Sequence, residues 1–231
     1  MIPLHDDNPT TIKPYLTISF IVACSLVFLW QLSLGTRGFE MAVYRLGVIP
    51  ATLLGDKTLP PELVVIPPAL TVFSSMFMHG GWMHLIGNML YLWIFGNNIE
   101  DSMGHVRFVL FYLLCGVAAV FAQALPDTES TIPMIGASGA ISGVLGAYLL
   151  LFPRAHVLVL IPLGLYAHTT RLPAMVVLGF WFLLQLLNSA LADPGKGGVA
   201  FGAHIGGFIA GMVLLPLFKH RHVRLFAPRR H

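Results

Sequence analysis

Long apolar stretches separated by shorter polar segments run along the chain from about residue 15 to about residue 218. A stretch of roughly 20 apolar residues is long enough to cross a bilayer as a helix. The pattern predicts six spans, at residues 15–34, 82–99, 106–125, 138–152, 172–191 and 200–218. We therefore expect an all-α membrane protein, in which residues 1–231 form a single six-helix domain with its core at about 15–218.

The composition supports this class. Hydrophobic residues make up 56% of the chain, charged residues only 10%, and the mean hydropathy is +0.79. A soluble domain carries about 25% charged residues, so too few polar residues are present for a second, water-soluble domain. Cys24 and Cys115 both lie inside apolar runs. They are expected to be small core residues and not a disulfide or a thiol nucleophile.

The basic residues predict the orientation of the spans. Basic residues concentrate in loops on the cytoplasmic side of membrane proteins. With the N-terminus inside, the inner segments hold Lys13, Arg107, Arg154, Arg171, Lys219, Arg221, Arg224, Arg229 and Arg230, whereas the outer segments hold Arg37, Arg45, Lys57 and Lys196. Both termini are therefore expected inside. The basic tail then faces lipid headgroups, and we expect no nucleic-acid partner.

Three segments depart from a simple run of long spans. Residues 35–80 form a long outer loop that is rich in proline and in large apolar residues, so a partly interfacial structure is expected. Residues 156–166 are too short to span and are expected to form a re-entrant or surface segment on the inner side. The span at 138–152 is only about 22 Å long as a helix, against a hydrocarbon core of about 30 Å. If it begins below the outer surface, Ser138 lies within the thickness of the membrane.

Unusual polar residues occur near the starts of three of these spans. With this topology the spans at 82–99, 138–152 and 200–218 all run from outside to inside. Their first turns carry His84 and Asn88, Ser138, and His204 respectively. All four residues are therefore expected in the outer half of the membrane. Ionisable and polar groups are costly there and usually mark functional sites.

Small residues at a spacing of four predict that two of these spans pack closely. The members of the stripes are Gly139, Gly143 and Ala147 on one span, and Ala203, Gly207 and Gly211 on the other. Such stripes let membrane helices approach backbone to backbone. Ser138 and His204 are then expected to come within reach of one another.

The chemistry that these residues offer is acyl transfer. Ser138, between Gly136 and Gly139, provides a nucleophile, and neutral His204 provides a base that accepts its proton. The backbone N–H of Ser138, the amide of Asn88 and a ring N–H of His84 can donate to a developing oxyanion. Each residue taken alone also has a simpler interpretation. Ser138 could belong to a small-residue packing site, each histidine could be an interfacial residue, and Asn88 could join two helices by a hydrogen bond.

The sequence resembles the rhomboid family of intramembrane serine proteases over about residues 77–211. The stretches that carry the resemblance are His79-Gly-Gly-Trp-Met-His84 followed by Asn88, Phe95-Gly96 with Glu100 and Gly104, Gly136-Ala-Ser138-Gly139, and Gly202-Ala-His204 followed by Gly207. The resemblance implies that Ser138 is the nucleophile and His204 the general base, without cofactor or metal. It also implies an oxyanion hole made of His84, Asn88 and the Ser138 amide, and a structural, water-organising role for His79.

The resemblance further implies substrates that are single-span membrane proteins, cut in or near the spanning segment after lateral access between the second and fifth spans. A prokaryotic inner membrane, with the active site toward the outer face, is the expected location. One departure concerns His204: Ser142 stands where some family members place an aromatic residue against the base, so a hydrogen bond is expected to hold the imidazole instead. A second departure is the absence of the Trp-Arg pair that many members carry in the first outer loop.

Two other functions fit part of the pattern. A rhomboid-like scaffold could bind membrane spans without cutting them, although it would not need both Ser138 and His204. A catalytic zinc site could use His79, His84 and His204, since three histidines can hold zinc. The sequence contains no H-E-x-x-H motif, so the protease is the preferred hypothesis.

Overall fold

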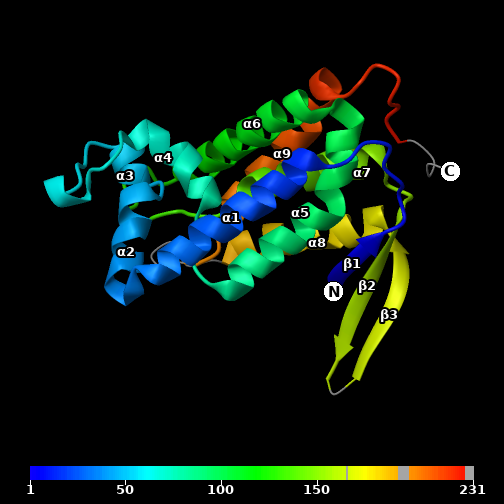
Figure 1. Cartoon of the computed structure of the whole chain (residues 1–231), viewed down its shortest axis with the longest axis horizontal. Helices are drawn as coiled ribbons and strands as arrows, with labels where there is room; N and C mark the ends of the chain where they lie inside the picture. Colours follow the sequence, from blue (N-terminus) through cyan, green and yellow to red (C-terminus); the bar gives the residue numbers. More distant parts are fainter. Residues whose placement is uncertain (165, 192–197, 227–231) are drawn as a thin grey trace.

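The computed structural model describes residues 1–164, 166–191 and 198–226, and helices make up most of it (Figure 1). A helix occupies each stretch that the hydropathy pattern marks as a span. These helices are α1 (Tyr15–Ser33), α5 (Trp82–Met103), α6 (His105–Ala124), α7 (Ser138–Leu151), α8 (Ala174–Leu191) and α9 (Phe201–Phe218).

The helices have the length and apolarity of a multi-pass membrane protein. Among the described residues, α1, α6, α8 and α9 are each long and apolar enough to cross a bilayer. Helix α5 meets the same criterion together with the segment Pro61–Phe77, from which it is bent by 79°. Helix α7 is a shorter apolar helix, as its sequence predicts.

The chain between α1 and α5 folds into a series of short helices. They are α2 (Gly35–Leu46), α3 (Pro50–Leu53), the 3-10 turn η1 (Pro61–Leu63), α4 (Pro68–Ser74) and the 3-10 turn η2 (Ser75–Phe77). Three of these elements, α3, η1 and α4, begin with proline, which is preorganised for the first turn of a helix. In Figure 1, α2, α3 and α4 gather at one end of the helix bundle.

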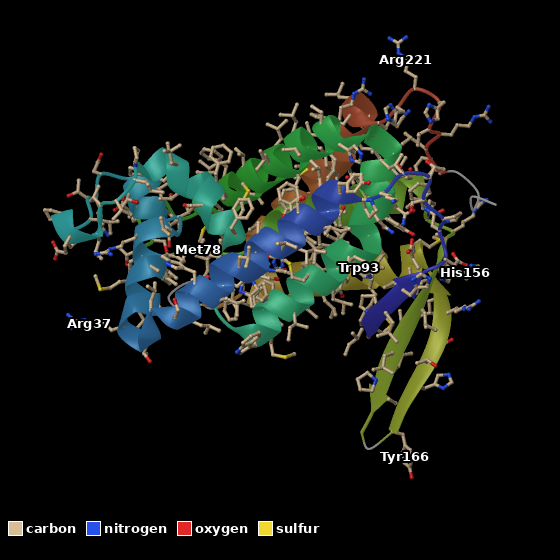
Figure 2. All side chains as sticks on the ribbon, in the orientation of Figure 1. Arg37, Met78, Trp93, His156, Tyr166 and Arg221 are labelled. Atoms are coloured by element: carbon tan, nitrogen blue, oxygen red, sulfur yellow. The ribbon has the colours of Figure 1, made fainter. Side chains whose placement is uncertain are left out.

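A three-stranded antiparallel sheet lies at the other end of the bundle, so the prediction of an all-α chain is wrong in this region (Figure 1). Strand β2 (His156–Leu163) pairs with β1 (Ile2–Asp6) on one side and with β3 (Tyr166–Pro173) on the other. Strand β2 and the first residue of β3 thus stand where a re-entrant or surface segment was expected, and α8 begins at Ala174, two residues later than expected. Figure 2 shows Tyr166 at the far tip of this hairpin.

The alternation of burial along β2 explains why this stretch is a strand. Val157 and Val159 are fully buried, whereas His156 and Leu158 are more exposed. β-Branched residues at a period of two suit a strand with one covered face. Pairing with β1 comes from a segment about 150 residues earlier in the sequence, so a local pattern could not reveal the sheet.

Helices α7 and α9 pack backbone to backbone through the two small-residue stripes, as predicted. A Cβ atom on Gly207 would overlap the carbonyl oxygen of Gly139, and one on Gly211 would overlap the carbonyl oxygen of Gly143. This contact brings the first turns of α7 and α9 side by side, which places Ser138 and His204 on neighbouring helices.

Buried polar groups attach the start of the chain to the end of α5. Glu100 is fully buried and accepts hydrogen bonds from the backbone N–H groups of Leu16 and Thr17 at 2.9 and 2.8 Å. Asp101 accepts hydrogen bonds from the backbone N–H and the hydroxyl of Thr11 at 3.0 and 2.6 Å. Glu100 lies about 24 Å along the helix from His84. It is therefore a structural residue and lies outside the group of polar residues near the start of α5.

Asp6 is the buried acid that joins β1 to the helices. Its Oδ2 atom accepts hydrogen bonds from the Tyr148 hydroxyl at 2.6 Å and from Asn98 Nδ2 at 2.9 Å. Asn8 Nδ2 donates to Asn98 Oδ1 at 2.7 Å. Burial raises the pKa of Asp6 to about 6, although the hydrogen bond from Tyr148 and the nearby His5 act in the opposite direction.

We expect Gly207→Ala to destabilise the protein by about 1–3 kcal/mol, because the added methyl group overpacks the α7–α9 contact. The measurement is thermal unfolding in detergent. Gly179→Ala on α8 is the matched control, since nothing lies within 4 Å of the position that its added methyl group would take. A Gly207→Ala protein as stable as the control contradicts the backbone contact.

Asp6→Asn is expected to reduce the pH dependence of stability. The folded protein binds the Asp6 proton more tightly than the unfolded chain does, so the stabilising contribution is complete below about pH 4 and is lost as the pH rises through 6. A rise in pKa from 3.8 to about 6 corresponds to at most about 3 kcal/mol. Unfolding midpoints at about pH 4.5 and 7.5 test this: the wild type should lose more stability than Asp6→Asn, and equal losses contradict it.

Candidate active site

Ser138 is the first residue of α7 and follows a glycine with an unusual backbone conformation. Gly136 has a φ of +128°, a value that L residues with side chains rarely adopt. A Cβ atom on Gly136 would lie 2.7 Å from His84 Nε2 and 3.5 Å from Ser138 Oγ. Gly136 therefore leaves the space between the imidazole of His84 and the hydroxyl of Ser138 free of side-chain atoms.

His84 and Asn88 lie one turn apart on α5. His84 Nδ1 accepts a hydrogen bond from the backbone N–H of Gly80 at 3.3 Å. Its other nitrogen, Nε2, therefore carries the ring proton and is the donor that faces Gly136. The Asn88 side chain is 8% exposed, and among the described residues its buried Nδ2 atom has no hydrogen-bond acceptor. Two N–H donors are thus available on this face of α5.

His204 lies in the first turn of α9 and is held from α8. Its Nδ1 atom is 2.8 Å from Gln185 Oε1, and Gln185 Nε2 donates to the carbonyl oxygen of Trp181 at 3.2 Å. The Trp181 ring lies beside the imidazole with a centroid distance of 5.8 Å. His204 and Gln185 are both more than nine-tenths buried, at 9% and 8% exposed.

One cavity of about 1250 Å³ collects the candidate groups. Ser138, His204, His84 and Asn88 all line it, together with Trp181 from α8. The hydrogen bonds found among the described residues do not include one between Ser138 Oγ and His204, so the two side chains share the cavity without being bonded to one another. The first turn of α7 also leaves the backbone N–H of Ser138 without a partner inside its own helix.

His79 lies directly behind His84. Its side chain is fully buried, and the two imidazole rings meet edge to face with a centroid distance of 5.1 Å. The Gln31 amide holds the main chain of His79 on both sides: Oε1 accepts from the N–H at 3.0 Å and Nε2 donates to the carbonyl at 3.3 Å. Gln31 on α1 therefore holds His79 in place, and the His79 ring packs against His84.

The remaining glycines of the predicted site are packing positions. A Cβ atom on Gly139 would lie 2.5 Å from Ala119 Cβ, and one on Gly202 would lie 2.7 Å from Gln123 Oε1. Gly207 contacts the Gly139 carbonyl, as described above. These glycines let α7 and α9 approach α6 and each other.

Sequence reasoning missed Gln185 and Trp181. The available signal was a glutamine within an otherwise apolar span, four residues after a tryptophan and therefore on the same helical face. Ser142 donates a hydrogen bond to the Ser138 carbonyl at 2.6 Å and does not contact the imidazole. Because position 142 lacks an aromatic residue, a hydrogen bond was expected to hold the His204 imidazole. The contact between Gln185 Oε1 and His204 Nδ1 agrees with this expectation.

Comparison with known proteins agrees with the family resemblance that the sequence motifs indicate. The Rhomboid domain family matches residues 68–221. Rhomboid protein 1, mitochondrial, of Saccharomyces cerevisiae is 30% identical over 184 residues, which cover 76% of this chain and 50% of that protein. Rhomboid protease GluP of Bacillus subtilis is 31% identical over 202 residues, which cover 86% of this chain and 34% of GluP. The chain thus spans between about a third and a half of the length of these relatives.

Proposed function

Because the chain belongs to the rhomboid family, we propose that it is an intramembrane serine endopeptidase that uses Ser138 and His204 as a catalytic dyad. The observation that carries the proposal is the convergence of these two residues with His84 and Asn88 on one cavity in an apolar protein. The unsatisfied Asn88 amide gives this cavity a buried donor that needs an acceptor. Such a donor suits an oxyanion that forms in the cavity.

The proposed reaction proceeds in two steps. Ser138 Oγ attacks the carbonyl carbon of the scissile peptide bond while its proton passes to His204. The carbonyl oxygen becomes an oxyanion, which the backbone N–H of Ser138, the amide of Asn88 and His84 Nε2–H stabilise. Collapse of this intermediate breaks the C–N bond, and the leaving amine takes the proton from His204. A water molecule then hydrolyses the acyl-enzyme by the same route, and the proton returns to Ser138.

Ser138 and His204 line the same cavity, and the lack of a hydrogen bond between them among the described residues is compatible with this role. Hydrogen bonds between a nucleophile and its base are often long in free enzymes and tighten when substrate binds. The backbone contact of α7 and α9 keeps Ser138 and His204 on two helices that are packed against one another.

The proposed substrates are single-span membrane proteins that are cut in or near their spanning segment. We propose that the whole chain is one domain with both termini inside, and that the cavity opens toward the outer face of a prokaryotic inner membrane. Figures 1 and 2 are compatible with this orientation, because the sheet and Arg221 lie at one end of the bundle and α2 with Arg37 at the other. Substrate would reach the cavity laterally between α5 and α8, both of which contribute residues to its lining.

We expect Ser138→Ala and His204→Ala each to abolish cleavage of single-span substrates by the protein reconstituted in lipid, while insertion is unchanged. Each change removes half of a nucleophile–base pair. A serine-directed fluorophosphonate should label the wild type but not Ser138→Ala. Full cleavage by either variant contradicts the protease, and absence of both cleavage and labelling in the wild type supports the scaffold. Loss of activity with a strong chelator would instead support the zinc site.

Asn88→Ala is expected to lower kcat by about a hundredfold with a smaller effect on KM. The lost amide stabilises charge that develops in the transition state, and removal of one oxyanion donor typically has this size of effect. Steady-state kinetics with a fluorogenic substrate in detergent measure both constants. Ile86→Ala on the same helix is a suitable control, because Ile86 is 52% exposed and does not line the cavity. An equal change in both variants contradicts the role of Asn88.

A further inference from the structure

We propose that Gln185 is the positioning residue for His204: its amide oxygen accepts the Nδ1–H of the imidazole, so that Nε2 is the atom that takes the proton of Ser138. This inference rests on the proposed function. It adds a third residue, from a helix that supplies neither member of the dyad, to the machinery of the reaction.

The hydrogen bonds of Gln185 fix which way its amide faces. Its Nε2 atom donates to the Trp181 carbonyl, and a carbonyl oxygen can only accept. Its Oε1 atom is therefore the end that lies 2.8 Å from His204 Nδ1. An amide oxygen can only accept as well, so Nδ1 of the neutral imidazole must carry the proton. The lone pair of the base is thereby left on Nε2.

Aromatic side chains complete the positioning of the imidazole. The Trp181 ring lies at 5.8 Å and an interplanar angle of 34° from it, and the Phe201 ring meets it edge-on at 6.4 Å. No carboxylate is hydrogen-bonded to His204 among the residues that the structure describes. The neutral amide of Gln185 therefore occupies the place that an acidic residue takes in a serine–histidine–aspartate triad.

The position of Gln185 on α8 makes the state of the base depend on that helix. Most side chains of α8 face outward, and its buried residues are Ala174, Val177, Leu178 and Gln185. The first three belong to the half of α8 next to the sheet, whereas Gln185 is the buried contact in the half next to the cavity. If α8 moves away from α9 to admit a substrate, His204 loses its acceptor and can rotate or change tautomer. His204 Nε2 is then held ready to accept the Ser138 proton only when α8 packs against α9.

The first test is kinetic. Gln185→Met keeps the length of the side chain but removes the strong acceptor, whereas Gln185→Glu keeps an oxygen next to Nδ1. We expect Gln185→Met to lower kcat by at least about tenfold with little change in KM, and Gln185→Glu to restore a substantial part of the loss. Leu183→Ala is the control on the same helix, because its side chain is 59% exposed. Equal kcat in wild type and Gln185→Met overturns the proposal.

The second test does not require activity. The ¹⁵N NMR spectrum of the protein labelled at its ten histidines reports which ring nitrogen carries the proton, and His204→Ala identifies the signal of His204. We expect the Nδ1–H form in the wild type and in Gln185→Glu, and a mixture of tautomers in Gln185→Met. An Nε2–H form in the wild type, or an unchanged spectrum in Gln185→Met, overturns the proposal even if the protein cleaves nothing.

The two tests separate this inference from the protease assignment. If the wild type does not cleave or react with fluorophosphonate, the proposed function fails while the NMR result still decides the contact. If Gln185→Met does not fold, as judged by size-exclusion chromatography, Gln185→Asn replaces it, because its amide is one carbon too short to reach the imidazole. Retention of wild-type kcat and tautomer by a folded Gln185→Asn also overturns the proposal.

Discussion

The backbones of α7 and α9 touch at two pairs of glycines, at a separation that any larger residue would prevent. In a membrane the hydrophobic effect does not drive apolar helices together, so close packing and hydrogen bonds between helices must do so. The contact is therefore both the main cohesive feature of this half of the bundle and the reason that Ser138 and His204 lie on the same cavity. Every polar group of the candidate site is arranged around this pair of helices.

Burial of polar groups carries a cost that the structure compensates unevenly. Glu100, Asp101 and Asp6, at the end of the bundle near the sheet, have several hydrogen-bond donors around them. At the candidate site the Asn88 amide has no acceptor within the described part of the chain. A stable protein tolerates few such groups. A transient negative charge in the cavity would give the Asn88 amide the acceptor that it lacks.

The sequence predicts the helices and most of the site because both depend on local patterns. Twenty-residue apolar runs determine α1, α6 and α9, and the spacing of Gly139 and Gly207 determines which helices meet. The sheet could not be predicted, because β2 is apolar enough to be taken for membrane-embedded chain and its partner β1 is remote in sequence. Gln185 was missed for a different reason: one glutamine in an apolar span indicates a contact between helices but not which atom it contacts.

The sheet also gives the start of the chain a mechanical connection to α8. Strand β1 is hydrogen-bonded to β2, β2 to β3, and β3 leads without a loop into Ala174 at the start of the helix. The first residues therefore contact both the end of α5, through Asp6 and Asn98, and the strands that lead into the helix that carries Gln185. A change to the strand pairing of β1 would thus reach α8 at its first residue, Ala174, which is the end of the helix remote from Gln185.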